Sequence, residues 1–170
     1  MLRLALCAAA LLLAGCDPAD PGRGQDCATG TLTATAAGSA YAADCVVLSF
    51  SNGGASLTAL TNIDGSDGST QRQIVITIPN AAEGTYRAPF EAIPVYVDGA
   101  FDGGRQVSGT ITSGTSGTVT VSSVTDSSIE GTFSFSGPET EFATSTGQPG
   151  SSTSTGRTVQ VTGGSFDVRL

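Results

Sequence analysis

The chain contains no histidine and no tryptophan, and its seven basic residues are all arginine because lysine is absent as well. Without histidine, the Ser-His-Asp and Cys-His arrangements of hydrolases are excluded, together with most zinc and haem sites. Without lysine, Schiff-base chemistry is excluded too. Carboxylates and tyrosines are the acid–base groups that remain.

Positive charge is scarce overall. Fifteen acidic residues stand against the seven arginines, so the formal net charge is −8. Such a chain repels nucleic acid and anionic lipid headgroups, and it lacks the basic patch that phosphate binding requires. We therefore expect no nucleic-acid partner.

The N-terminal apolar run is too short to span a membrane. Leu4 to Leu13 comprises ten residues, whereas a transmembrane helix needs about 20. One positive charge, Arg3, precedes the run, and the small residues Ala14 and Gly15 follow it. This pattern is typical of a secretory signal peptide that is removed from the mature protein.

The end of the run, Leu13-Ala14-Gly15-Cys16, resembles the lipobox of bacterial lipoproteins. The resemblance implies that residues 1–15 are a signal peptide cut before Cys16, and that Cys16 receives a diacylglycerol on its sulfur and an acyl group on its new amine. Two or three acyl chains hold a domain at a membrane persistently. We therefore expect a protein of the bacterial cell envelope, anchored by lipid in the outer membrane or on a membrane that faces the periplasm.

The remaining cysteines support an exported chain. Cys7 leaves with the signal peptide and Cys16 is lipidated, so the mature protein keeps Cys27 and Cys45. In an oxidising compartment this pair predicts one disulfide, which stabilises the fold by about 3 kcal/mol in the chain-entropy model. Residues 16–27, rich in proline, glycine and aspartate, predict a flexible tether, of which residues 17–26 reach at most about 35 Å when fully extended.

Residues 28–170 show the two-residue period of β-strands and no sustained helical period. Val46, Leu48 and Phe50 alternate with smaller or polar residues, and dipeptides such as Asp98-Gly99 mark hairpin turns between such runs. We expect an all-β domain, an antiparallel β-sandwich or a barrel-like variant of it, with about ten strands. Pro94 predicts an edge strand or a bulge. The expected strands are near 31–36, 39–43, 45–51, 56–62, 71–79, 84–88, 93–97, 105–112, 117–125 and 128–136, followed by a final hairpin at 157–170. The polar segment 143–157 predicts a long mobile loop.

Several strand and turn motifs carry a family resemblance. Gly84-Thr85-Tyr86, then Ser116–Gly137 with its "GTVTV" and "GTFSF" strands, then the closing "VTGGSFDVRL", are similar to a family of small secreted bacterial lipoproteins of uncharacterised activity. Gly163 stands where that family tends to have asparagine. The resemblance covers most of residues 31–170. It implies a β-sandwich and no particular catalytic or binding residue.

Two groups of residues are candidate sites. Tyr96 and Phe101 flank Asp98 and Asp102, so these four residues are a candidate ligand face for a glycan or another envelope protein. The competing interpretation is that the aromatic rings pack in the core or at its edge, which is where most aromatic residues of a small domain are needed.

A calcium site is a weaker candidate. Asp64 and Asp67 lie in a glycine-rich stretch, "DGSDGS", and carboxylate oxygens are the ligands that calcium prefers. The stretch lacks the EF-hand pattern, and Asp-Gly is also a common hairpin turn. We therefore favour turn chemistry and expect no cofactor beyond the covalent lipid on Cys16.

The sequence predicts a lipid-anchored, non-catalytic binding or structural domain rather than an enzyme. The alternative is a glycan-active enzyme that works with two carboxylates about 5 to 10 Å apart. Its candidate acids are Glu83, Glu91, Asp98, Asp102, Glu130, Glu139 and Glu141.

Overall fold

A computed structural model describes residues 27–61, 70–102, 105–143 and 151–170, and this part of the chain consists of eleven strands and connecting turns, with no helix. Accordingly, it offers no helix that is long and apolar enough to cross a bilayer. The strands are β1 (Thr29–Ala36), β2 (Ser39–Ala42), β3 (Cys45–Ser51), β4 (Gly54–Leu60), β5 (Thr70–Ile78), β6 (Gly84–Arg87), β7 (Ile93–Asp102), β8 (Arg105–Ser113), β9 (Ser116–Val124), β10 (Ser128–Ala143) and β11 (Ser151–Arg169).

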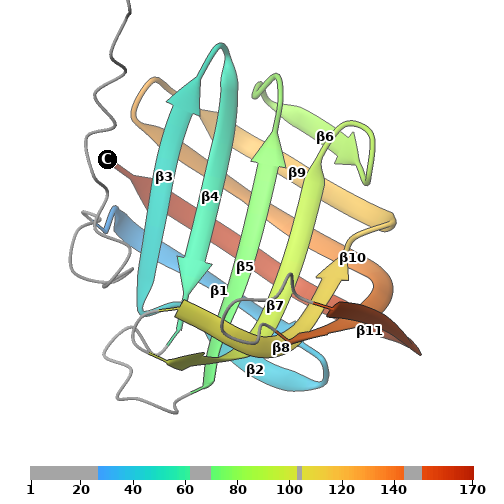
Figure 1. The fold of residues 1–170 in the computed structure, drawn as a ribbon. Helices are drawn as coiled ribbons and strands as arrows, with labels where there is room; N and C mark the ends of the chain where they lie inside the picture. The colour runs from blue at the N-terminus through green and yellow to red at the C-terminus, as the bar shows by residue number, and fades with distance from the viewer. Residues whose placement is uncertain (1–26, 62–69, 103–104, 144–150) are drawn as a thin grey trace, which may run out of the picture.

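The strands form one antiparallel sheet that folds over on itself. Nine of them follow the order β2-β1-β11-β10-β8-β7-β5-β4-β3, while β9 pairs with β10 and β6 pairs with β9. Figure 1 shows β3, β4, β5 and β7 as a front layer that crosses over β1, β11, β10 and β9 behind it. The result is a barrel-like β-sandwich, which confirms the predicted all-β class.

The two longest strands connect the layers. In the rear layer, β10 lies between β9 and β11, but its last residues, Glu139–Ala143, pair with β8 of the front half of the sheet. The pairing of β10 with β11 shifts register between Pro138 and Thr140. Just before this shift, a Cβ on Gly137 would lie 1.8 Å from the carbonyl oxygen of Ser113, so only glycine allows the strands to approach so closely.

Alternating residues of both layers fill the space between them. Ile74, Ile76 and Ile78 of β5 are fully buried, and they belong to the same core cluster as the aromatic rings of the rear layer. There the Phe133 centroid lies 6.2 Å from that of Phe166, and the Phe133 ring packs over Gly164 on the neighbouring strand. The interior is thus a packed apolar core, as the strand period predicts.

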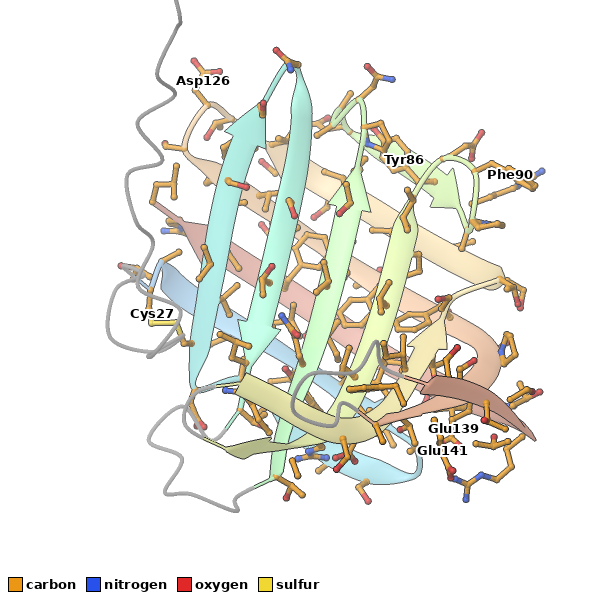
Figure 2. All side chains as sticks on the ribbon, viewed as in Figure 1. Cys27, Tyr86, Phe90, Asp126, Glu139 and Glu141 are labelled. Carbon is orange, nitrogen blue, oxygen red and sulfur yellow. A yellow bond between two sulfur atoms is a disulfide. The ribbon has the colours of Figure 1, made fainter. Side chains whose placement is uncertain are left out.

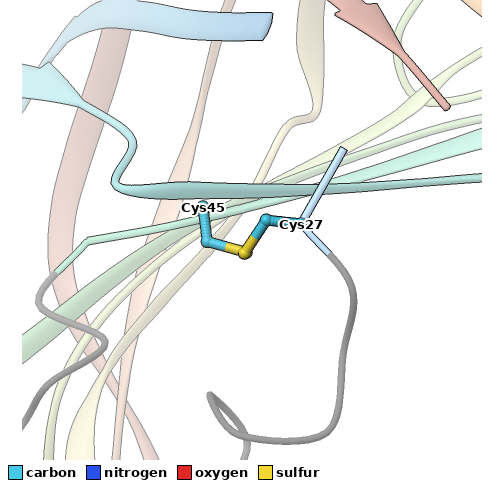
Figure 3. Close-up of a disulfide and its surroundings, with 2 residues drawn as sticks. All are labelled: Cys27 and Cys45. Atoms are coloured by element: carbon cyan, nitrogen blue, oxygen red, sulfur yellow. A yellow bond between two sulfur atoms is a disulfide. The ribbon is translucent and has the colours of Figure 1, made fainter. Parts of the chain in front are cut away.

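A disulfide and a hydrogen bond join the two layers where no strand pairing of the described residues connects them, between the residues before β1 and the strand β3. Figure 3 shows the disulfide between Cys27 and Cys45, whose Cα atoms are 5.3 Å apart, next to the first residues of the described chain. Beside it, the Ala28 backbone N–H donates to the carbonyl oxygen of Val46 at 2.7 Å. These two links join the beginning of the rear layer to β3, the outermost strand of the front layer, and they confirm the predicted disulfide.

Three details of the predicted strand layout are wrong. Pro94 lies in β7, an interior strand between β5 and β8, rather than at an edge. Its carbonyl oxygen accepts from the N–H of Gly114, just beyond the end of β8. Because N and O of one strand residue point the same way, the missing N–H of Pro94 faces a place where no β8 ladder residue remains.

The other two differences concern β11. Residues 151–157, predicted to belong to a loop, form the start of β11, and the predicted hairpin at 157–170 is the rest of the same strand. Gly163, with φ at 59°, sits at a register shift within the strand instead of in a turn. Residues 144–150 of the predicted loop lie outside the described residues.

We predict that replacing both Cys27 and Cys45 by serine lowers the free energy of unfolding by about 3 kcal/mol, because the unfolded chain is no longer cross-linked. Urea unfolding of the purified protein measures the change. Addition of a reductant to the unmodified protein should cause a loss of the same size. An unchanged urea midpoint in the double variant would contradict this account.

Candidate functional site

A row of facing residues crosses the front half of the sheet and changes from apolar to polar. On β3, β4 and β5 its members are aliphatic, but on the next three strands they are Tyr96, Thr112 and Glu139. Tyr96 pairs with Thr112, and Thr112 pairs with Glu139. All three side chains are buried, so the apolar core gives way to a buried polar group at this corner of the sandwich.

Glu139 is held by an ion pair and a hydrogen bond. The Arg157 Nε donates to Glu139 Oε2 at 2.7 Å, and the Arg157 Nη2 contacts the same oxygen. The Thr155 hydroxyl lies 2.9 Å from Oε2 and 3.2 Å from the Glu139 backbone oxygen, so its one proton can go to either. The Glu139 side chain is only 9% exposed, whereas that of Arg157 is 66% exposed. A solvent-facing cation therefore neutralises an almost buried anion.

Thr112 lies next to Glu139 in the row but, unlike Glu139, has an unsatisfied polar group. It is 1% exposed, and its Oγ1 has no hydrogen-bond partner among the described residues. An unmade hydrogen bond of this kind costs about 1 to 3 kcal/mol unless an ordered water fills it.

The second polar group surrounds Arg72 of β5. Its guanidinium donates to the Ala40 carbonyl oxygen at 3.0 Å and lies 5.4 Å from the centre of the Tyr41 ring, a cation–π contact. Arg72 pairs with Asp98 across β5 and β7, and the Tyr96 hydroxyl lies 3.3 Å from Asp98 Oδ2. One arginine thus bridges the short strand β2 to the polar end of β7.

Burial dominates the acid–base behaviour of the two tyrosines. It raises the pKa of Tyr96 to about 12, with a further contribution from the negative charge of Asp98, while Arg72 lowers it. Burial also raises the pKa of Tyr41 well above its ordinary value, despite a hydrogen bond with the backbone and the nearby Arg72. Both phenols therefore stay neutral as hydrogen-bond donors over the physiological range.

Two of the candidate carboxylates come together on β10. Glu139 and Glu141 are two residues apart in a regularly paired stretch, so they share one face of the strand at a Cα separation of roughly 6.6 Å. Figure 2 shows both side chains at the same corner of the molecule. Glu141 also lines a shallow depression of about 400 Å³ together with Thr110 and Thr153.

The other candidate acids are dispersed. Glu91 accepts a hydrogen bond from the Arg87 backbone N–H at 2.8 Å, Glu83 precedes β6, and Glu130 is exposed on the outward face of β10. Glu83 and Glu91 thus lie in the turns before and after β6, and Glu130 lies on the opposite face of β10 from Glu139 and Glu141.

The predicted ligand face is only partly described. Tyr96 is 3% exposed and contributes its ring to the core, which is the packing role weighed against ligand contact, and Asp98 is half-buried beside it. Of Phe101 and Asp102 only the backbone is described, in β7 opposite Gln106 and Arg105. The exposed ligand face of four side chains therefore remains a prediction. The buried ring of Tyr96 offers no open surface to a ligand.

The lipidation and calcium candidates lie outside the described residues, since these exclude Cys16, Asp64 and Asp67. Within the described ranges, no cluster of three or more histidine, cysteine, aspartate or glutamate side chains is arranged to hold a metal ion.

Reasoning from the sequence missed Arg157, Thr155 and Thr112. One signal was available: Glu139 is in phase with the inward-facing Phe133 and Phe135, so it must be buried, and a buried carboxylate needs a cation. The strand pairings that bring Arg157 and Thr112 next to Glu139 could not be predicted from the local sequence.

We predict that the protein loses stability as the pH rises above about 10. Unfolded tyrosines ionise near that pH, whereas the folded state holds the protons of Tyr41 and Tyr96 more tightly, so alkali favours the unfolded chain. Lysine is absent and contributes no competing titration. Urea unfolding across this range should show a shallower decline for Tyr41→Phe/Tyr96→Phe, and an identical slope would refute the assignment.

We also predict that Arg157→Ala costs about 1 to 2 kcal/mol of unfolding free energy, less than a fully buried pair because Arg157 is mostly exposed. In a Glu139→Gln background the same substitution should cost almost nothing, since no buried charge is left unpaired. Denaturant midpoints of the four proteins of this double-mutant cycle provide the measurement. Strict additivity would show that the pair does not interact.

Comparisons with protein-family models, with curated proteins and with solved structures found no match to this chain. The residues that the fold brings together are therefore what bears on function.

Proposed function

We propose that the protein is a lipid-anchored domain of the bacterial cell envelope that acts by presenting a surface to a partner and carries out no catalysis. The observation that carries the proposal is the Cys27–Cys45 disulfide. Structural disulfides persist in oxidising compartments, and this one lies immediately after the tether that follows the lipobox cysteine, Cys16. Export and the lipobox resemblance thus point to the same location.

The anchor and the fold are compatible in length. Residues 17–26 separate Cys16 from the first described residue, Cys27, and reach at most about 35 Å when extended. The disulfide fixes the end of this tether to β3 and so to the rest of the sheet. The domain consequently stays close to the membrane and acts on what lies within that reach.

The state of the acids supports a non-catalytic role. Glu139, the most buried of the described carboxylates, has one oxygen saturated by Arg157 and Thr155. Asp98 lies against the Tyr96 hydroxyl. Such contacts account for these groups as parts of the fold, without a substrate.

The second candidate is a glycan-active hydrolase. It is favoured by one observation, the position of Glu139 and Glu141 on one face of β10, where Glu141 lines a shallow depression. Two side chains on one face of a strand, with Cα atoms roughly 6.6 Å apart, can bring their carboxyl groups to the separation of about 5 to 10 Å that glycosidases use. In this alternative Glu139, which is paired with Arg157, is the nucleophile or base and Glu141 is the acid.

Mass spectrometry of the protein purified from its host tests the anchor. We expect an N-terminal peptide that begins at Cys16 with acyl groups attached, and release of a Cys16→Ser variant from the membrane fraction. An intact leader peptide on mature protein, or a different first residue, would overturn the proposal.

A hydrolysis assay separates the two functions. We expect no release of reducing ends from a panel of polysaccharides by the wild-type protein. Turnover that disappears in both Glu139→Gln and Glu141→Gln, but persists in Glu91→Gln as a matched control on a separate element, would instead establish the enzyme.

A further inference from the structure

The outward face of the rear layer is a field of hydroxyl groups. Its central row runs in register across five strands, from β1 through β11, β10 and β9 to β6, and every member carries a hydroxyl. We call this row the hydroxyl ladder; it consists of Thr33, Ser165, Thr132, Thr120 and Thr85. Four of its five side chains are exposed and Thr120 is half-buried.

The next outward row on one side of the ladder also carries hydroxyl groups. Thr35 pairs with Thr162, and Ser134 pairs with Thr118, on the row beyond the ladder. Charged residues lie only around the field: Glu130 and the Asp167–Arg169 ion pair on the opposite side, and Arg87 at the β6 end. The field itself is uncharged, although the mature chain has six arginines against fifteen acids, a net charge of −9.

The hydroxyls are held in place and remain able to bind. Thr33 and Ser165 lie 3.1 Å apart through their hydroxyl oxygens, as do Thr85 and Thr120, at the two ends of the ladder. The hydroxyl of the central Thr132 makes no hydrogen bond to another described residue. Because threonine is β-branched, its χ1 angle is restricted in a strand, so little side-chain entropy is lost when a partner binds.

The outward rows of the front layer are mixed in composition. One consists of Val47, Thr58, Val75 and Val95, three of them aliphatic, and the next consists of Ser49, Ser56, Thr77 and Ile93, so neither carries a hydroxyl on every strand. All three rows contain β-branched residues, as strands favour, but only the rear row adds hydroxyls on every strand.

The geometry selects the shape of the partner. Strands are about 4.8 Å apart, so the ladder spans roughly 19 Å and offers a hydroxyl at each step. An antiparallel sheet twists by about 20° or more per strand, so the ladder is a twisted track that does not match a flat crystalline surface. A single extended chain with repeating hydroxyl groups can follow such a track.

We infer that the hydroxyl ladder binds an extended, uncharged polysaccharide chain through hydrogen bonds between hydroxyl groups, with the threonine methyl groups against the sugar rings. The field offers no cation for a polyanionic glycan, and the net negative charge of the mature chain repels such a polymer. This inference rests on the proposed function, since a domain that only presents a surface needs a partner that the surface fits.

Native gels containing a soluble polysaccharide test the inference on the full mature protein, kept in a mild nonionic detergent. We expect retardation by at least one of the neutral polymers hydroxyethyl cellulose, dextran and galactomannan, persisting at high salt because no ion pairs are involved. Anionic alginate should not retard the protein. Absence of retardation by all three neutral polymers, or binding to alginate or to crystalline cellulose alone, would overturn the inference.

Substitutions locate the binding surface. Thr33→Val/Thr120→Val/Thr132→Val keeps side-chain shape and strand preference but removes three hydroxyls, and it should weaken binding about tenfold or more. Thr58→Val, the same change on the front layer, is the matched control and should bind like the wild type. Equal weakening by Thr58→Val, or full binding by the triple variant with an unchanged circular dichroism spectrum, would refute the ladder as the site. Acylation of Cys16 is measured independently, so the inference can fail while the lipid anchor stands.

Discussion

The fold depends on one corner, at which β10 passes from the rear layer to the front half of the sheet. A single sheet buries only one face, and it forms a core here because it turns that face onto itself. β10 keeps the same phase through the corner, since Phe135 before it and Glu139 after it both point inward. Gly137 makes this possible, because any side chain there would collide with the Ser113 backbone. Without the corner the two layers would separate and expose the apolar core.

The parts of the fold that follow from the sequence are those set by local periodicity. The alternation in Ile74, Ile76 and Ile78 is a property of one strand and predicts its inward face without reference to any partner. Residues 151–157 could not be assigned in this way, because a Ser/Thr/Gly stretch has the same composition in a loop and in an outer strand. Only the pairing with β10 shows that this stretch is a strand. Pro94 fails for a related reason, since the direction of its absent N–H matters only in relation to the end of β8.

The same division applies to the polar corner. The burial of Glu139 is a local matter of phase, but the identity of its cation depends on the long pairing of β10 with β11, which brings Arg157 back from 18 residues away. Thr112 reaches Glu139 through a third strand. Buried polar groups are therefore placed by register, which is non-local, and a group left without a partner, as the Thr112 hydroxyl is among the described residues, lowers stability.

The outward hydroxyls of the ladder need no specific partner, because water can satisfy them. In this they differ from the buried polar groups at the corner. Threonine on an exposed strand position is favoured by its β-branch, and the same branch holds its hydroxyl in a fixed direction. In the hydroxyl ladder, the residue that suits the strand is also the residue that suits a neutral polysaccharide, so recognition requires no loss of stability. At the corner, by contrast, Thr112 and Glu139 add buried polarity. Arg157 and Thr155 offset that of Glu139, and the Thr112 hydroxyl has no partner among the described residues. A surface built from fold-compatible residues can extend over five strands, whereas a buried polar cluster must remain small.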